Sequence, residues 1–277
     1  MTIDARLERL VISSPDVERV AKFYVDAFGY CAEMHGDEAR CEAPGRSLWI
    51  RSGRVNQLLE SRFVFANSAA LDCYIERLEK RRITFTRQYG ESGISIRIQD
   101  PDDRSVCFAV NVESRPVASG GAGEKHFARL QHYAVRTPVP QVLLDFYANS
   151  LGFTVSDLVR DQAGDLTAAF LRSDAEHHSL AIFRAAEPRF DHFSCETQDW
   201  HSLRDWADLM ARRSVHLAWG IGRHGPGNDT FFMVLDPDCN LAEISSDLEQ
   251  CAPERAVGSW DHRMETLNQW GVAIMRS

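Results

Sequence analysis

The fold is decided by residues 5–15, ARLERLVISSP, because this pattern returns in the second half of the chain at residues 128–138 as ARLQHYAVRTP. Further matched segments follow in the same order in both halves: Phe23-Tyr24 with Phe146-Tyr147, Glu60-Ser61-Arg62-Phe63 with Glu187-Pro188-Arg189-Phe190, and Asp100-Pro101-Asp102 with Asp236-Pro237-Asp238. Such internal similarity indicates a duplicated structural unit. The sequence therefore predicts two similar domains in tandem.

The two copies differ at three positions that matter for chemistry. Superposing the repeats pairs a cation, an aromatic ring and a thiol in the first copy with two histidines and a carboxylate in the second: Arg9 with His132, Phe65 with His192, and Cys107 with Glu243. Histidine and carboxylate side chains are common metal ligands. We therefore expect the first copy to be a scaffold and the second copy to carry a site.

Length and composition limit the class of protein. The 277 residues, of which 44% are hydrophobic, suffice for two globular domains of about 100–150 residues. A net charge of −9 argues against a nucleic-acid partner, and no apolar run approaches the roughly 18 residues of a membrane span. Seven scattered cysteines without C-x-x-C spacing favour a reducing compartment, so we expect a cytoplasmic protein.

Each copy shows the same order of secondary structure. A short apolar strand is followed by a turn at Pro15 or Pro138 and by a helix that ends near Gly29 or Gly152. Several short strands and a second helix come next, and a strand closes each copy after the Asp-Pro-Asp turn. This order predicts an α+β fold of four βαβββ-like units, two in each copy.

A stretch rich in glycine and serine before the second copy sets the domain boundaries. We predict an N-terminal domain over residues 1–118, a linker over 119–126, a C-terminal domain over 127–247 and a tail over 248–277. The repeat ends before the tail, so the pattern assigns the tail no secondary structure.

The second copy carries a longer motif around its Asp-Pro-Asp turn. Gly222-Arg223-His224-Gly225 and Phe231-Phe232 precede Asp236-Pro237-Asp238, and Glu243 follows. With this motif, residues 5–247 resemble the type I extradiol ring-cleaving dioxygenases of the vicinal oxygen chelate superfamily, which includes glyoxalases and bleomycin resistance proteins. The resemblance implies paired βαβββ modules forming a curved mixed sheet around a central cavity in each domain. It also implies a metal-free N-terminal domain and a tail that closes over the pocket as a lid.

The resemblance implies that His132, His192 and Glu243 bind one metal ion. Two imidazoles and one carboxylate on one face of an octahedral ion leave three positions for a bidentate diol and O₂. The residues themselves support this assignment, since Glu243 lies in the otherwise apolar segment Leu241–Ile244, where a lone carboxylate is costly to bury without a partner. We expect Fe(II), with Mn(II) as the alternative.

Three further histidines are candidate site residues. The resemblance implies that His178 is the acid/base near the O₂ position, which a pKa of about 6.5 would allow at neutral pH, and that His224 hydrogen-bonds a substrate hydroxyl. Strand alternation would let only one of His177 and His178 face the metal, so His177 is kept as a substrate contact. The match of residues 220–225 to G-x-G-x-x-G is rejected, because Pro226 follows where a dinucleotide site needs a helix.

A group of apolar side chains is predicted to line the substrate pocket: Trp219, Phe193, Phe231 and Met233. Met233 lies ten residues before Glu243, where many relatives place a tyrosine that contacts the substrate. Trp219 lies in a loop where relatives that cleave homoprotocatechuate carry an arginine. Both replacements favour an uncharged substituent on the substrate ring.

The sequence therefore predicts an Fe(II)-dependent extradiol dioxygenase of aromatic catabolism. It would use O₂ to open a catechol-like substrate to a semialdehyde, and it would assemble as a homo-oligomer, either a dimer or a tetramer. Two alternatives stay open. One is a related metalloenzyme that acts on a non-catechol enediol or a heterocycle, or as an isomerase or lyase. The other is a non-catalytic small-molecule-binding protein of the antibiotic-resistance type.

Overall fold

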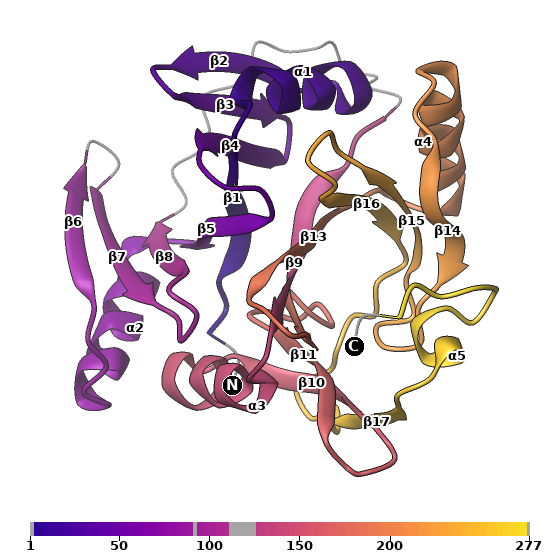
Figure 1. Cartoon of the computed structure of the whole chain (residues 1–277). Helices are drawn as coiled ribbons and strands as arrows, with labels where there is room; N and C mark the ends of the chain where they lie inside the picture. Colours follow the sequence, from indigo (N-terminus) through magenta and orange to yellow (C-terminus); the bar gives the residue numbers. More distant parts are fainter. Residues whose placement is uncertain (1–2, 91–92, 111–125, 276–277) are drawn as a thin grey trace.

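The computed structural model of the chain describes residues 3–90, 93–110 and 126–275. Its first half folds as two βαβββ units that share one sheet (Figure 1). The first unit comprises β1 (Arg6–Ser14), α1 (Val17–Phe28), β2 (Cys31–His35), β3 (Glu38–Ala43) and β4 (Arg46–Ser52). The second comprises β5 (Gln57–Phe65), α2 (Ser68–Lys80), β6 (Thr86–Gly90), β7 (Gly93–Gln99) and β8 (Ser105–Val110).

The second half repeats this arrangement and adds the tail. The third unit comprises β9 (Arg129–Thr137), α3 (Pro140–Asp145), the π-helix η1 (Phe146–Leu151), β10 (Thr154–Arg160), β11 (Leu166–Arg172) and β12 (Leu180–Arg184). The fourth comprises β13 (Arg189–Glu196), α4 (Trp200–Arg212), β14 (Leu217–Arg223), β15 (Thr230–Leu235) and β16 (Leu241–Ser246). The tail contains β17 (Gly258–Asp261) and α5 (Met264–Leu267).

The two sheets have the same strand order. The first sheet runs β2-β3-β4-β1-β5-β8-β7-β6, and the second runs β10-β11-β12-β9-β13-β16-β15-β14, with β17 added beside β10. In each sheet the two βαβββ units meet at the antiparallel pair of their first strands, β1 with β5 and β9 with β13. Figure 1 shows that the second sheet curves strongly. The predicted α+β fold of four βαβββ units is therefore confirmed.

Local sequence explains the first helix of each half. The N-cap Asp16 accepts a hydrogen bond from the Arg19 amide, and α1 ends at Gly29, whose φ of 72° suits glycine. The equivalent helix begins at Pro140, continues into the π-helix and ends at Gly152 with a φ of 87°. The predicted ends of both helices are confirmed, whereas nothing in the pattern indicated the π-helical turn.

Strand register corrects one of the predicted equivalences between the halves. His192 on β13 faces Ala134 on β9, and the corresponding pair in the first sheet is Glu60 facing Val11. The counterpart of His192 is therefore Glu60, and the prediction of Phe65 is wrong. Equivalent residues of β5 and β13 are thus 132 positions apart in the sequence (192 minus 60). The repeated Glu-x-Arg-Phe segment had implied a separation of 127 positions (187 minus 60). Strand pairing, not this short likeness, fixes which side chains are equivalent.

The other two equivalences are confirmed by the same ladders. Arg62 on β5 faces both Arg9 on β1 and Cys107 on β8. Ser194 on β13 likewise faces both His132 on β9 and Glu243 on β16. Arg9 thus corresponds to His132, and Cys107 corresponds to Glu243.

Two reciprocal hydrogen bonds join the halves. The Tyr24 hydroxyl donates to Asp236 Oδ2, and the Tyr147 hydroxyl donates to Asp100 Oδ2, each over 3.1 Å. Both tyrosines are buried, and both carboxylates also accept backbone N–H groups of their own turns. The repeated Phe-Tyr and Asp-Pro-Asp motifs are therefore explained by the packing of one half against the other.

The tail packs along the second sheet. β17 pairs in parallel with β10, and the Trp219 indole donates to the Val272 carbonyl oxygen over 2.8 Å. The Gln269 amide donates to the Arg223 carbonyl oxygen over 2.8 Å. The tail thus contacts both outer edges of the second sheet. Of the predicted linker over residues 119–126, all but the last residue lies outside the described residues.

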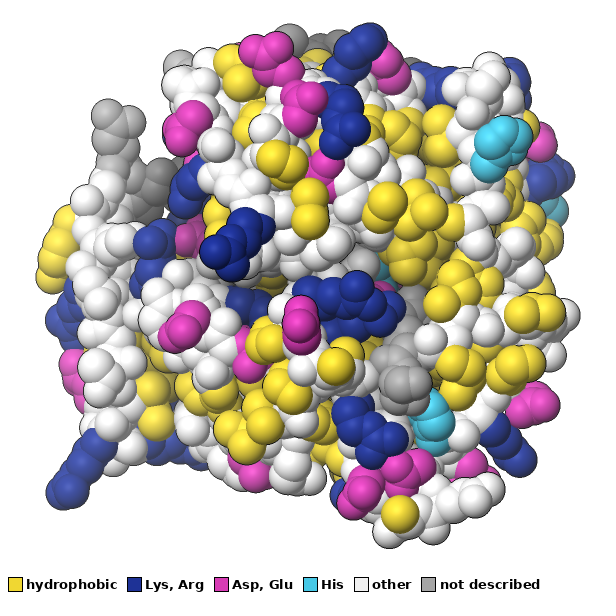
Figure 2. All heavy atoms as spheres, viewed as in Figure 1, with side chains coloured by type: hydrophobic (Ala, Val, Ile, Leu, Met, Phe, Trp, Pro, Cys, Tyr) yellow, Lys and Arg dark blue, Asp and Glu magenta, His cyan; other side chains and the backbone are white. Residues whose placement is uncertain are grey.

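One face of the molecule is shown in Figure 2, where acidic, basic and hydrophobic side chains are interspersed. Among the residues described by the structure, no helix combines the length and the apolar character needed to cross a membrane.

Replacing Tyr24 or Tyr147 with phenylalanine should lower the free energy of unfolding by about 1.5–3 kcal/mol, since each change removes a donor from a buried carboxylate. Tyr89→Phe is a matched control because that side chain is 75% exposed, and it should change stability by less than about 0.5 kcal/mol. Urea unfolding followed by circular dichroism measures the difference. Equal stability of the three variants would contradict a role of the reciprocal bonds in joining the halves.

Candidate metal centre

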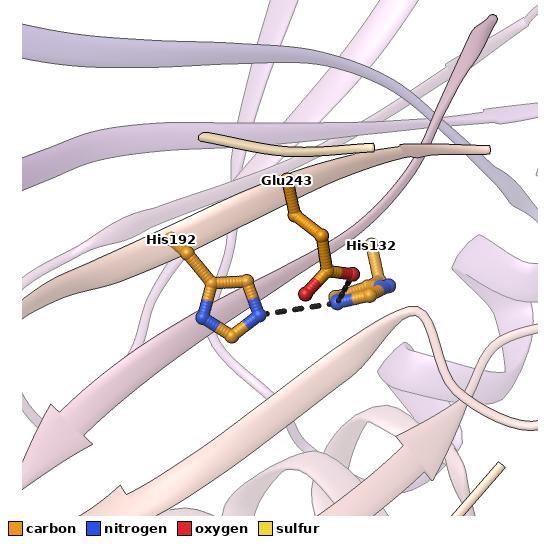
Figure 3. Close-up of side chains that lie close together, drawn as sticks. All are labelled: His132, His192 and Glu243. Carbon is orange, nitrogen blue, oxygen red and sulfur yellow. Dashed lines mark hydrogen bonds and ion pairs between the residues drawn. The ribbon is translucent and has the colours of Figure 1, made fainter. Parts of the chain in front are cut away.

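Three adjacent strands carry the predicted metal ligands. His132 lies on β9, His192 on β13 and Glu243 on β16, and β13 is the middle strand of the three. All three side chains are buried, and Figure 3 shows them pointing towards one another. The parallel and antiparallel ladders of β13 therefore bring together His132 and Glu243, which are 111 positions apart in the chain (243 minus 132).

The ring nitrogens that face the centre carry lone pairs. His132 Nε2 lies 3.2 Å from His192 Nε2 and 3.7 Å from Glu243 Oε1 (Figure 3). On the other side of each ring, His132 Nδ1 contacts the side-chain oxygen of Gln131, and His192 Nδ1 lies 2.6 Å from Asp191 Oδ1. Because those oxygens accept, each Nδ1 carries the hydrogen, and each Nε2 is free to bind a metal ion.

Gln131 and Asp191 owe their positions to β-bulges. The register between β9 and β13 skips both residues, one directly before each histidine. A bulge interrupts the strict alternation of a strand, which allows neighbouring side chains to contact each other. The residue directly before each histidine has a side-chain oxygen that can accept a hydrogen bond, in Gln131-His132 and in Asp191-His192. This pattern could have indicated the two contacts from the sequence, but it was not used.

Three electron-pair donors meet at this point. Neither carboxylate oxygen of Glu243 has a hydrogen-bond partner within the described part of the chain. Burial lowers the pKa of His132 to about 3. Burial favours neutral Glu243, but the neighbouring histidines, His224 foremost, outweigh it and lower the pKa of Glu243 to about 2. Two imidazoles and an ionised carboxylate fit a divalent cation that takes mixed nitrogen and oxygen ligands.

His178 lies next to these ligands. Its ring centroid is 4.3 Å from that of His132, and its side chain lines the adjacent cavity. Burial lowers the pKa of His178 well below the usual value of about 6.5, so the ring is neutral at neutral pH. His177 lies behind it, with the two Nδ1 atoms 3.0 Å apart. Both residues precede β12, so strand alternation, from which we expected only one of them to face the metal, does not apply here.

His224 approaches Glu243 from the end of β14. Its ring stacks on Phe231 with 3.7 Å between the centroids, and its Nδ1 donates to the Leu267 carbonyl oxygen over 2.6 Å. Its Nε2 lies 3.6 Å from Glu243 Oε2. Burial disfavours protonation of His224, but Asp229 and Glu243 raise its pKa. Burial also raises the pKa of Asp229 to about 7, and this residue was missed by the sequence reasoning.

A small cavity of about 20 Å³ lies beside the ligands. Its histidines are His132, His178, His192 and His224, and its apolar wall consists of Phe170, Ala181, Phe183, Pro226 and Leu267. Leu267 belongs to α5, so the tail contributes one wall of this cavity.

Three of the predicted pocket residues lie in the apolar cluster of the second sheet. Trp219, Phe231 and Met233 pack there against the apolar cavity wall, and Met233 pairs in register with Glu243. Phe231 supports the ring of His224, and the Trp219 indole is directed to the tail. These side chains therefore shape the wall behind the cavity.

Phe193 lies on the other side of β13. Its ring is 5.8 Å from that of Tyr24 in the first half, within the main core. Neighbouring residues of a strand face opposite sides, and His192 faces the cavity. Phe193 therefore packs between the halves and does not share the cavity with His192.

The corresponding place in the first half holds a salt bridge. The Arg9 guanidinium lies 3.2 Å from Glu60 Oε1 and 3.7 Å above the Trp49 ring. Arg62 donates to the Cys107 sulfur over 3.8 Å. A fixed guanidinium thus supplies the positive charge beside Glu60, which supports the expected scaffold role of this half.

Comparison with known proteins gives matches to one superfamily. Residues 129–244 match the family model of the Glyoxalase/Bleomycin resistance protein/Dioxygenase superfamily. "Metapyrocatechase 2" of Cupriavidus necator is 27% identical over 97% of this chain and 89% of its own. The homoprotocatechuate 2,3-dioxygenase of Brevibacterium fuscum superposes with a TM-score of 0.80 at 23% identity, covering 99% of this chain and 91% of that one. The Mn(II)-bound glyoxalase of Novosphingobium aromaticivorans gives a TM-score of 0.81 at 19% identity, covering 99% and 93%.

Residues 129–244 thus match this superfamily, and the similarity to a protein named as a metapyrocatechase extends over nearly the whole chain. The matched region contains His132, His192 and Glu243, so all three candidate ligands lie in the part of the chain that the family model describes.

Replacing His132 or His192 with alanine, or Glu243 with glutamine, should abolish metal retention, because two ligands alone hold a divalent ion weakly. Elemental analysis after iron loading and gel filtration should find about one metal ion per wild-type chain. Cys107→Ser is the matched control, since it changes the equivalent position of the first half, and it should retain the metal. Two ions per chain, or loss of metal from Cys107→Ser, would contradict this assignment.

Proposed function

We propose that this protein is an iron(II)-dependent extradiol dioxygenase, which opens the aromatic ring of a catechol-like substrate next to its diol and produces a semialdehyde. The observation that carries the proposal is the convergence of His132, His192 and Glu243 beside a cavity that two further histidines line. Its similarity to named ring-cleaving dioxygenases supports the same chemistry.

Iron(II) held by His132, His192 and Glu243 would supply open positions at which a diol and O₂ bind side by side and exchange electrons. Glu243 contributes the one negative charge of this ligand set, so the site accommodates a singly ionised catechol. Manganese(II) suits the same ligands, and the family resemblance favours iron(II).

His178 is placed to move protons. Because its ring is buried and neutral, it can accept a proton from a catechol hydroxyl bound in the cavity and return that proton later in the reaction. The hydrogen bond of His224 to the Leu267 carbonyl oxygen fixes the other ring, which leaves its Nε2 for a substrate oxygen. We therefore assign acid/base catalysis to His178 and substrate binding to His224.

The cavity wall favours uncharged catechols. Phe170, Phe183 and Leu267 line it, and Met233 packs beside Glu243 in the same apolar cluster. None of these side chains can neutralise a carboxylate on the substrate ring. An alkyl or aryl substituent would instead bury apolar surface against them.

We also infer a cytoplasmic enzyme of aromatic catabolism that assembles as a dimer or a tetramer. Seven cysteines without C-x-x-C spacing support a reducing compartment. The metabolic role and the oligomer are inferred from the family resemblance.

Anaerobic loading with Fe(II), followed by O₂ uptake with a panel of catechols, tests this function. We expect O₂ consumption together with the yellow colour of a ring-opened product. The ratio kcat/KM should favour an alkyl- or aryl-catechol over a carboxymethyl-catechol by about 1–3 kcal/mol, because the apolar wall leaves a carboxylate unpaired. Glu243→Gln is the control and should show neither signal.

Two outcomes would contradict these assignments. Tight catechol binding without O₂ uptake by the iron-loaded protein would indicate a binding protein. A clear preference for the carboxylated substrate would mean that a cation reaches the cavity wall.

His178→Ala and His178→Asn should retain iron and bind catechol anaerobically, but they should lower turnover on the order of 10²–10⁴-fold. His224→Ala should weaken catechol binding as well as turnover, because its bond is to the substrate. Anaerobic titration and steady-state O₂ uptake distinguish the two effects. His201→Ala, an exposed histidine on α4, is the control and should change neither. Undiminished turnover in His178→Ala would assign the proton transfer to another residue.

A further inference from the structure

A buried chain of polar contacts lies behind His178. Its Nδ1 is 3.0 Å from His177 Nδ1, and His177 Nε2 is 3.1 Å from Asp157 Oδ2. His177 and Asp157 are 0% exposed, and His178 is 3% exposed. Neither His177 nor Asp157 belongs to the candidate ligands or to the cavity lining. The function proposed above leaves both residues without a role.

The tail holds the carboxylate of Asp157. Arg255 and the Gly258 amide donate to Oδ1 over 3.0 and 3.2 Å, and the Trp260 indole donates to Oδ2 over 2.7 Å. Pairing of β17 with β10 places Gly258 directly opposite Asp157. A Cβ atom at Gly258 would lie 2.2 Å from Oδ1, so this approach requires glycine. Burial favours the neutral acid, but contacts with His177, Trp260 and Arg255 outweigh it and lower the pKa of Asp157.

The ionised Asp157 decides which nitrogen of His177 carries hydrogen. A carboxylate only accepts, so a bare Nε2 would place two acceptors 3.1 Å apart. The contact between His177 Nε2 and Asp157 Oδ2 is short but does not have the geometry of a hydrogen bond. The negative charge of Asp157 therefore favours hydrogen on Nε2 through electrostatic attraction.

The tautomer of His178 follows from that of His177. Neutral His177 with hydrogen on Nε2 presents a lone pair at Nδ1. The hydrogen of the 3.0 Å contact between the rings must then come from His178 Nδ1. His178 Nε2 is left with a lone pair, which is the form that accepts a proton from a substrate hydroxyl.

We propose that Asp157 and His177 are positioning residues that fix the tautomer and ring orientation of His178, and that the tail holds them in place. The proposal rests on the acid/base role proposed for His178. It makes the tail a support of the proton-transfer step, in addition to being a wall of the cavity.

Nitrogen NMR of the histidines tests this relay without any turnover. The full chain is loaded with Zn(II), a diamagnetic ion that takes the same ligand types. In the wild-type protein we expect His178 to carry hydrogen on Nδ1. Asp157→Asn should move His178 towards the Nε2–H tautomer, because a carboxamide can donate to His177 and reverse both hydrogens. Asp161→Asn is the matched control, since Asp161 pairs with Arg184 just beyond β10, and it should leave the tautomer unchanged.

Kinetics of the same variants separate positioning from folding. In the Fe(II)-loaded protein, Asp157→Asn should lower kcat on the order of 10–100-fold, with KM for catechol and the iron content close to wild type. Combined with His178→Asn, it should cause no further loss, since both changes act through one ring. A role in folding alone would lower the iron content and leave kcat per iron unchanged, and that result would overturn the proposal.

Two substitutions of His177 keep the test decisive if Asp157→Asn does not fold. His177→Asn keeps an acceptor oxygen at the position of Nδ1 and should preserve the Nδ1–H tautomer of His178, whereas His177→Leu should lose it. An Nε2–H tautomer in the wild-type protein, or no change in His177→Leu, would overturn the relay. Full turnover in His178→Asn, together with the expected tautomer changes, would contradict the acid/base role and leave the relay intact.

Discussion

The buried carboxylate of Glu243 is the constraint on which the second domain depends. It is 0% exposed, and within the described residues neither of its oxygens has a hydrogen-bond partner. A lone carboxylate in such surroundings is costly unless an opposite charge offsets it. Gln131 and Asp191 accept hydrogen bonds from Nδ1 of His132 and of His192. The Nε2 atoms of these two rings therefore present lone pairs, not N–H groups, to the carboxylate. A divalent cation bound between these lone pairs and the carboxylate would supply the opposite charge.

The same backbone arrangement carries the candidate metal site in the second half and a salt bridge in the first. The ladder of β9 with β13 skips Gln131 and Asp191, and the ladder of β1 with β5 skips Glu8 and Leu59 at the equivalent positions. The bulges that bring a second residue beside each ligand are therefore present in both halves. Side chains alone decide the outcome, since a guanidinium beside Glu60 replaces the imidazole and the metal ion.

Much of the fold could be predicted from the sequence because its signals are local. Glycine at two helix ends and the two Asp-Pro-Asp turns mark element boundaries wherever they occur. Three candidate ligands could be predicted because duplication supplied a contrast within one chain and the family resemblance pointed to the same residues. The counterpart of His192 was predicted wrongly, because the repeats were aligned on the similar segments that begin at Glu60 and Glu187. The strand register, which decides the equivalence, cannot be read from the sequence. His177 and Asp157 were also beyond reach, because their roles depend on contacts between β10, the segment before β12 and the tail.

The central claim is that a metal ion at His132, His192 and Glu243 couples O₂ to cleavage of a catechol ring. A single-turnover measurement tests it most directly. Iron-loaded protein saturated anaerobically with one catechol is mixed with O₂, and both the O₂ consumed and the products are quantified. The account predicts equal amounts of O₂ consumed and ring-opened semialdehyde formed, each matching the bound iron. Release of unchanged catechol, or formation of a quinone in its place, would contradict it.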